Sequence, residues 1–209
     1  MSSSPVANSY GPEQWVPFVR AVVTGSWGEG RPLPEGYRLA TIAQLRRAAG
    51  LAALDAEITV ASVLGGHFPY DGGKAAQQAC VAVAPAMAIW HQGRTDCPPA
   101  RGNFGVSFGR LHRAQSRVPA KQDDPYRLDR SKDGAPGVTA RLHRLLRAKP
   151  EELASLLRYA VTLLQHAEGG PVLVDWTLLA SDVEEWYRDG QGGDVVRSWL
   201  RGFQEGLRA

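Results

Sequence analysis

The side chains able to do acid–base, nucleophilic or metal chemistry do not form a recognisable catalytic pattern. The five histidines are scattered along the chain: His67, His91, His112, His143 and His166. None stands in the H-E-x-x-H pattern of metalloproteases, and the chain has no phosphate-binding G-x-x-x-x-G-K-S/T loop and no G-x-G-x-x-G segment. The sequence therefore predicts a protein that is not an enzyme and needs no cofactor.

Two groups of residues could be taken for a metal or hydrolytic site. His91, Asp96 and Cys97 are close in sequence, but they are a single group with no second cluster at ligand spacing, so no metal site is predicted. Carboxylates near the C-terminus could act as the acid–base pair of a hydrolase. We instead expect Asp175 to cap a helix. The others are expected on the solvated face of that helix: Asp182, Glu184 and Glu185.

Basic side chains give the stronger chemical signal. The net charge is only +3, yet residues 101–150 carry twelve basic and four acidic groups, whereas residues 151–209 carry five and ten. Such an uneven distribution is typical of a surface that binds a polyanion. A solvated basic loop would have the same composition, so charge alone does not decide between the two.

The elements that must position these residues are helices. Apolar residues recur at helical spacing in nine segments: 13–23, 42–49, one through Ile58 and Leu64, 74–91, 104–114, 139–148, one starting at Pro150, and two through Trp186 and Phe203. Thr41, Asp175 and Asp194 are expected N-caps, and Gly50 and Gly169 are expected helix ends. No segment shows sustained alternation, so the predicted fold class is all-α, a helical bundle.

Composition predicts how the helices are grouped. Residues 1–12 are expected to form a flexible tail, 13–114 an N-terminal helical domain, 115–137 a basic linker and 138–209 a C-terminal helical bundle. The N-terminus lacks the pattern of a signal peptide, and the longest apolar run, 79–90, is too short to cross a bilayer. With only two cysteines, Cys80 and Cys97, a cytoplasmic protein without disulfides is expected.

Several short phrases add specificity by their order and spacing. They are LRRA at 45–48, IWHQ at 89–92, GVSFGRL at 105–111, ARLHRLLRA at 140–148, and VDWTLL at 174–179 followed by Asp182 and Trp186. In this combination the chain resembles the small subunit (CasB family) of Cascade, the type I-E CRISPR surveillance complex. The resemblance spans residues 42–203, and the loop at 28–36 and the basic segment at 115–137 are longer than in compact members.

The resemblance implies a non-catalytic, all-helical protein present in two copies in a crRNA-guided complex. Its implied partners are other Cascade subunits, the crRNA, the target DNA and a second copy of the chain. There it would stabilise the R-loop and line the path of the displaced non-target strand. Guide pairing supplies sequence recognition in such complexes, so this subunit needs only sequence-independent attraction to phosphates.

Matching the basic positions of the family suggests which residues bind nucleic acid. They are Arg46, Arg47, Lys74, Arg110, Arg141, Arg144 and Arg158. Arginine suits the task because it stays charged and can hold a phosphate with two parallel hydrogen bonds. Most of these arginines adjoin a leucine, so burial of the leucines is expected to bring the charges to one face: Leu45, Leu111, Leu142 and Leu145.

Two other functions remain open at this stage. The first is a sequence-specific helix-turn-helix DNA-binding protein, because residues 139–148 form a short basic helix. Against it, the leucines make the apolar side of that helix substantial, and no partner helix with a short turn precedes it. The second is a metal-dependent hydrolase, which stoichiometric metal in the purified protein would support.

Overall fold

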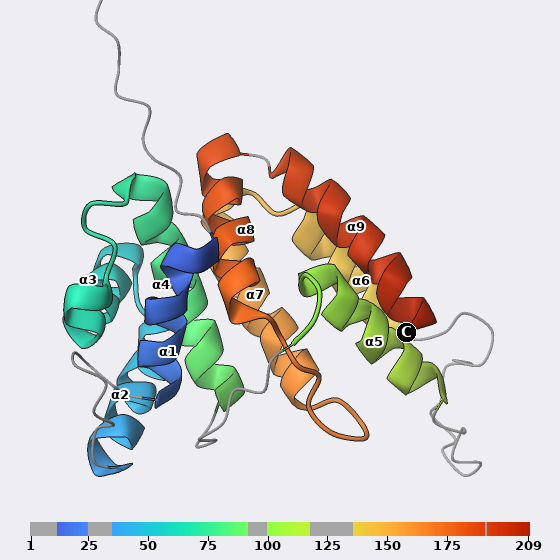
Figure 1. The fold of residues 1–209 in the computed structure, drawn as a ribbon, viewed down its shortest axis with the longest axis horizontal. Coiled ribbons are helices and arrows are strands. Elements are labelled where there is room, and N and C mark those ends of the chain that lie inside the picture. Colours follow the sequence, from blue (N-terminus) through green and yellow to red (C-terminus); the bar gives the residue numbers. More distant parts are fainter. Residues whose placement is uncertain (1–11, 25–34, 92–99, 118–135, 191) are drawn as a thin grey trace, which may run out of the picture.

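The computed structural model describes residues 12–24, 35–91, 100–117, 136–190 and 192–209. Within these residues the regular structure is helical and contains no β-strand, which confirms the all-α prediction (Figure 1). The elements are η1 (Pro12–Trp15), α1 (Val16–Thr24), α2 (Glu35–Ala48), α3 (Ala53–Leu64), η2 (Gly65–His67), α4 (Gly73–His91), α5 (Phe104–Arg117), α6 (Pro136–Leu146), α7 (Pro150–Gln165), α8 (Trp176–Asp189) and α9 (Gly193–Arg208).

Several predicted features fall outside the described residues. They are the tail up to residue 11, the loop at 28–34, Asp96, Cys97 and most of the predicted linker, 118–135. The division of the chain into domains therefore stays a prediction.

Helix α4 lies in the middle of the bundle, as its apolar composition predicts. It packs against α1, α2 and α3 and also against α7 and α8. Val83, Met87 and Trp90 are buried, and so are most of its many alanines. Small side chains on every side allow neighbouring helices to approach α4 closely. Cys80, also buried in α4, is a free thiol.

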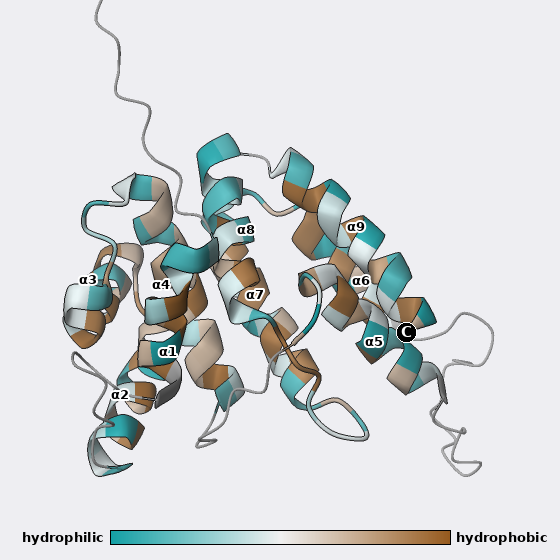
Figure 2. Ribbon diagram, viewed as in Figure 1, coloured by the Kyte–Doolittle hydropathy of each residue, from teal (hydrophilic) through white to brown (hydrophobic). Residues whose placement is uncertain are grey.

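A second group of helices, α5, α6 and α9, lies at the other end of the long axis from α2 and α3 (Figure 1). Helix α5 packs chiefly against α9 and also touches α6 and α7. Helix α7 joins the two groups because it contacts both α4 and α6, and the buried side chains of both groups form one continuous core. Figure 2 shows hydrophobic and hydrophilic bands along α7, α8 and α9, as expected for helices with one side in a core.

Glycines allow α5 and α9 to touch through their backbones. A Cβ atom on Gly105 would lie 1.9 Å from the Trp199 carbonyl oxygen, and one on Gly109 would lie 2.4 Å from the Phe203 carbonyl oxygen. From the other side, a Cβ on Gly206 would lie 2.3 Å from the Val106 carbonyl oxygen. Any side chain at these positions would force the helices apart, since atoms at such distances overlap.

The predicted start of the second helix is wrong. Thr41 was expected to cap it, but α2 begins at Glu35 and Thr41 lies within it. The first turns of α2 bury Arg38 and leave Tyr37 and Leu39 exposed. An apolar pattern cannot reveal a helical turn whose buried residue is an arginine, because the pattern counts only hydrophobic side chains.

Two further helix boundaries differ from prediction. Helix α7 ends at Gln165, and Gly169, at a φ of 88°, belongs to the turn that follows. Helix α9 has Gly192 rather than Asp194 at its N-cap, and the Asp189 carboxylate accepts a hydrogen bond from the backbone of its first turn. The capping oxygen therefore comes from the preceding helix, which sequence spacing does not reveal.

Other local signals are confirmed. Pro150 stands at the start of α7, and the Asp175 carboxylate accepts a hydrogen bond of 3.0 Å from the Leu178 backbone N–H at the start of α8. The structure also has Gly65, at a φ of 52°, as the C-cap of α3. No helix in the described part of the chain is long and apolar enough to span a membrane.

Candidate nucleic-acid interface

The basic residues predicted on α5 and α6 lie on helices that touch each other. Arg110 is half-buried on α5, and Arg141 and Arg144 are exposed on α6. The leucines beside them, Leu111 and Leu142, are buried as predicted. Burial of the leucines holds the two helices together, and it leaves Arg141 and Arg144 on the outer side of α6.

The other four predicted residues lie elsewhere. Arg46 and Arg47 are exposed in the last turn of α2, beside the buried Leu45. Lys74 is exposed in the first turn of α4, and Arg158 is half-buried on α7. Helix α2 packs against α3 and α4, at the opposite end of the molecule from α5 and α6 (Figure 1). The fold thus groups Arg110, Arg141 and Arg144 and sets Arg46 and Arg47 apart from them.

The predicted basic residues keep their charges available. Within the described ranges, none of the seven forms an ion pair; the ion pairs there involve Arg188 and Arg197. The described segments 100–117 and 136–149 carry four basic residues each and no acidic residue. Segments that carry cations and no carboxylate of their own favour attraction of phosphates.

Further basic residues share these segments and were not predicted, among them Arg113, Arg147 and Arg101. Arg113 on α5 is half-buried and lies three residues from Arg110, and hence on the same side of the helix. Arg147 and Arg101 are exposed near α6 and α5. The excess of basic groups in residues 101–150 signalled them, but matching to a family's basic positions passed over them.

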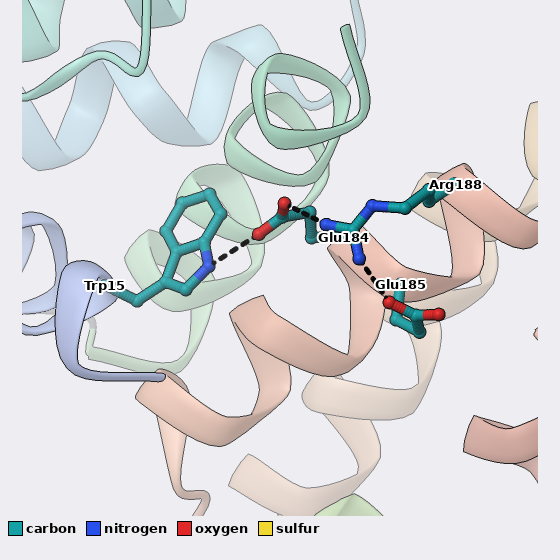
Figure 3. A network of polar contacts seen from close by, with 4 residues as sticks. All are labelled: Trp15, Glu184, Glu185 and Arg188. Atoms are coloured by element: carbon teal, nitrogen blue, oxygen red, sulfur yellow. Dashed lines mark hydrogen bonds and ion pairs between the residues drawn. The ribbon is translucent and has the colours of Figure 1, made fainter. Parts of the chain in front are cut away.

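One carboxylate expected in solvent is buried. Only 1% of Glu184 is exposed, and it accepts a hydrogen bond of 3.1 Å from the Trp15 indole N–H. Arg188, one turn further along α8, pairs with Glu184 and with the exposed Glu185 (Figure 3). The prediction of a solvated face is therefore wrong for Glu184 and right for Glu185. A buried charge needs partners, and here they attach the N-terminal segment to α8.

Asp182 is also not on a solvated face. It is partly buried and accepts a hydrogen bond of 2.6 Å from the Trp199 indole N–H, which connects α8 to α9. Burial raises the pKa of Asp182 to about 6, Asp175 adds to the rise, and the hydrogen bond from Trp199 acts in the opposite direction. Trp176, Trp186 and Trp199 are buried and belong to the core.

The prediction that the chain holds no catalytic pattern overlooked one match, because Gly105 to Gly109 fit the G-x-S-x-G pattern of serine hydrolases. Ser107 therefore has to be considered as a nucleophile. In those enzymes the serine stands exposed on a turn between a strand and a helix. Here it is buried in the first half of α5, and its hydroxyl donates a hydrogen bond of 2.8 Å to the Leu173 carbonyl oxygen. The motif is therefore a packing motif, in which two glycines face α9 and the serine joins α5 to the segment before α8.

His91, from the group that was considered and rejected as a metal site, lies in the core. His91 is buried at the end of α4 and contacts the rings of Trp90 and Trp176, at centroid distances of 5.0 and 6.3 Å. Over the described residues, no group of three or more His, Cys, Asp or Glu side chains is placed to hold a metal ion.

Comparison with known proteins identifies the family. The family model for CRISPR-associated protein Cse2 matches residues 41–203. Searches of curated proteins and of solved structures found no significant match. The matched region extends from α2 into α9 and includes the contacts of Gly105 and Gly109 with α9 and the basic residues of α5 and α6. The chain belongs to the CRISPR-associated protein Cse2 family and is a small subunit of the type I-E Cascade complex.

Proposed function

We propose that this subunit holds the backbone of nucleic acid without regard to sequence, and so stabilises the R-loop and the displaced non-target strand. The observation that carries the proposal is the basic surface of α5 and α6, defined by Arg110, Arg113, Arg141, Arg144 and Arg147. Its arginines form no ion pair within the described residues, and no carboxylate lies in the described parts of their segments. A subunit with this task needs no catalytic group.

Binding of this kind is spread over many weak contacts. Each partly exposed arginine–phosphate contact contributes about 1 kcal/mol after discounting for solvent. Five such contacts would make the affinity fall steeply with salt, because each neutralised phosphate releases counterions. The remaining candidates, Arg46, Arg47, Lys74 and Arg158, would extend the contact along a strand, with crRNA, target DNA, a second copy of the chain and other Cascade subunits as partners.

A sequence-specific helix-turn-helix protein fits the same helices less well. Only residues 147–149 separate α6 from α7, so α7 could serve as a recognition helix. Its first turn, which would enter the major groove, exposes Glu151 and Glu152. Two carboxylates there would be repelled by DNA phosphates. In α7 the two carboxylates instead interact favourably with the positive N-terminal end of the helix dipole.

R-loop formation by the reconstituted Cascade complex tests the proposal. We compare single Arg→Ala variants with two combined variants, Arg141→Glu/Arg144→Glu and Arg46→Glu/Arg141→Glu. Single variants should retain most activity, and the combined variants should lose at least about tenfold in target affinity at physiological salt, since reversal of a charge removes one contact and adds repulsion. The control is Arg197→Glu, at an exposed arginine already paired with Asp194.

The first combined variant tests the surface of α5 and α6. The second asks whether α2 and α6, at the two ends of the molecule, contact the same nucleic acid. If both variants assemble into Cascade and open target DNA like the wild type, phosphate binding by these residues is wrong. If the first variant loses target affinity, and the second loses no more than Arg141→Glu alone, Arg46 is not part of the interface.

A further inference from the structure

The turn that leads into α4 presents an aromatic ring to solvent in a fixed position. Tyr70 is 60% exposed, and its ring centroid lies 4.9 Å from that of Phe68 with the planes tilted by 59°. Phe68 itself is only 4% exposed and belongs to the core. The Tyr70 ring is therefore held on one side by a buried neighbour and is open on the rest of its surface.

The backbone of the same turn is also held. The Tyr70 N–H donates to the Phe68 carbonyl oxygen at 2.8 Å, and the Gly72 N–H donates to the Pro69 carbonyl oxygen at 3.1 Å. The Gln77 side chain, from the second turn of α4, donates to the Tyr70 carbonyl oxygen at 3.1 Å. A ring that is already ordered loses little conformational entropy when a flat ligand covers it.

Other exposed tyrosines lack this support. Tyr159 on α7 is 71% exposed and, within the described residues, makes no ring contact. Lys74 is exposed four residues after Tyr70, and it makes no ion pair within the described residues; the nearby Asp71 is also exposed. The charges of Lys74 and Asp71 cancel, so this turn is not an electrostatic site for phosphate alone. Its distinctive feature is the fixed, exposed ring of Tyr70, with the exposed Lys74 four residues further along the chain.

We propose that Tyr70 is a base-stacking site for single-stranded nucleic acid, with Lys74 contacting a phosphate of the same strand. The inference rests on the proposed function and adds that unpaired bases, and not only phosphates, are bound. Stacking on an aromatic side chain tolerates any base, because every base has a π-face. It therefore agrees with binding that does not depend on sequence, and it favours a displaced strand over a duplex.

Two oligonucleotides of equal length and charge separate stacking from phosphate binding. One is a labelled oligothymidylate and the other is the same strand with abasic sites, each titrated with the full-length chain and followed by fluorescence anisotropy. The wild type should bind the strand with bases more tightly, by roughly 5- to 150-fold, the range expected for one stacked base. Tyr70→Leu, which keeps an apolar contact with Phe68, should abolish that preference, whereas Tyr70→Phe should retain it.

Control variants separate base stacking on Tyr70 from phosphate binding by the chain. Tyr159→Ala should leave the preference unchanged, and Tyr70→Leu should bind duplex DNA like the wild type. If Tyr70→Leu keeps the preference for bases, or weakens both strands equally, stacking on Tyr70 is refuted while salt-dependent phosphate binding stands. If the wild type binds neither strand at low salt, phosphate binding by the chain fails, and the stacking site fails with it.

Discussion

Gly109→Ala should separate α5 from α9 and lower the stability of the subunit. The new Cβ would lie 2.4 Å from the Phe203 carbonyl oxygen and 2.7 Å from the Gly206 Cα, both of them backbone atoms. No side-chain rotation can relieve such a contact, so one helix must move by roughly 1 Å to reach an ordinary contact distance of about 3.4 Å. That movement would loosen the packing of the buried rings between the helices.

The expected change in the free energy of unfolding is the sum of two opposing effects. Overpacking a well-filled contact costs about 1–3 kcal/mol, and a backbone contact belongs near the upper value. Alanine returns about 1 kcal/mol because it is a better helix former than glycine. The expected net loss is about 2 kcal/mol in the free energy of unfolding, which for a chain of this size lowers Tm by about 4–8 °C.

Thermal unfolding followed by circular dichroism measures this loss. The matched control is Gly36→Ala in α2, where a Cβ would meet nothing within 4 Å, so that variant should melt at the wild-type temperature or above it. Because α5 carries Arg110 and Arg113, Gly109→Ala should also weaken binding of single-stranded DNA. A Gly109→Ala protein that melts at or above the wild-type temperature would refute the close backbone contact.

Four further substitutions test the polar groups of the core. A carboxyl whose pKa is raised by burial stabilises the fold at low pH and loses that contribution as pH rises through its folded pKa. The stability of Asp182→Asn relative to wild type should therefore increase between about pH 4 and pH 6, by at most about 3 kcal/mol. Urea unfolding at several pH values measures this, and a stability difference that does not change with pH would contradict it. Glu184→Ala leaves Arg188 without its buried partner and should lower the free energy of unfolding by about 3–5 kcal/mol. Trp15→Phe loses only one hydrogen bond to Glu184 and should lower it by about 1–3 kcal/mol. Equal effects of the two variants in denaturant unfolding would show that the ion pair is unimportant. His91→Ala should lower Tm without changing the affinity of folded protein for single-stranded DNA, since the side chain is buried in the core; a folded variant with lost binding would reveal a site at His91.

The sequence by itself determined the features that depend on neighbours along the chain. The capping carboxylate of Asp175, the proline that starts α7 and the central α4 with its many alanines all act within a few residues of their own position. The order of short phrases was sufficient to predict the family, because each phrase combines helix-forming residues with buried anchors such as Leu45 and Leu142.

Tertiary structure decided the features that join distant segments. Glu184 is buried because Trp15, 169 residues away, supplies a hydrogen bond, and Gly109 is needed because α9 comes within backbone contact. The grouping of Arg110 with Arg141, and their distance from Arg46, follow from which helices pack together. Apolar spacing in a single chain reports which side of a helix is buried, but not which helix covers it, so the partners of a buried charge and the members of a surface appear only in the folded molecule.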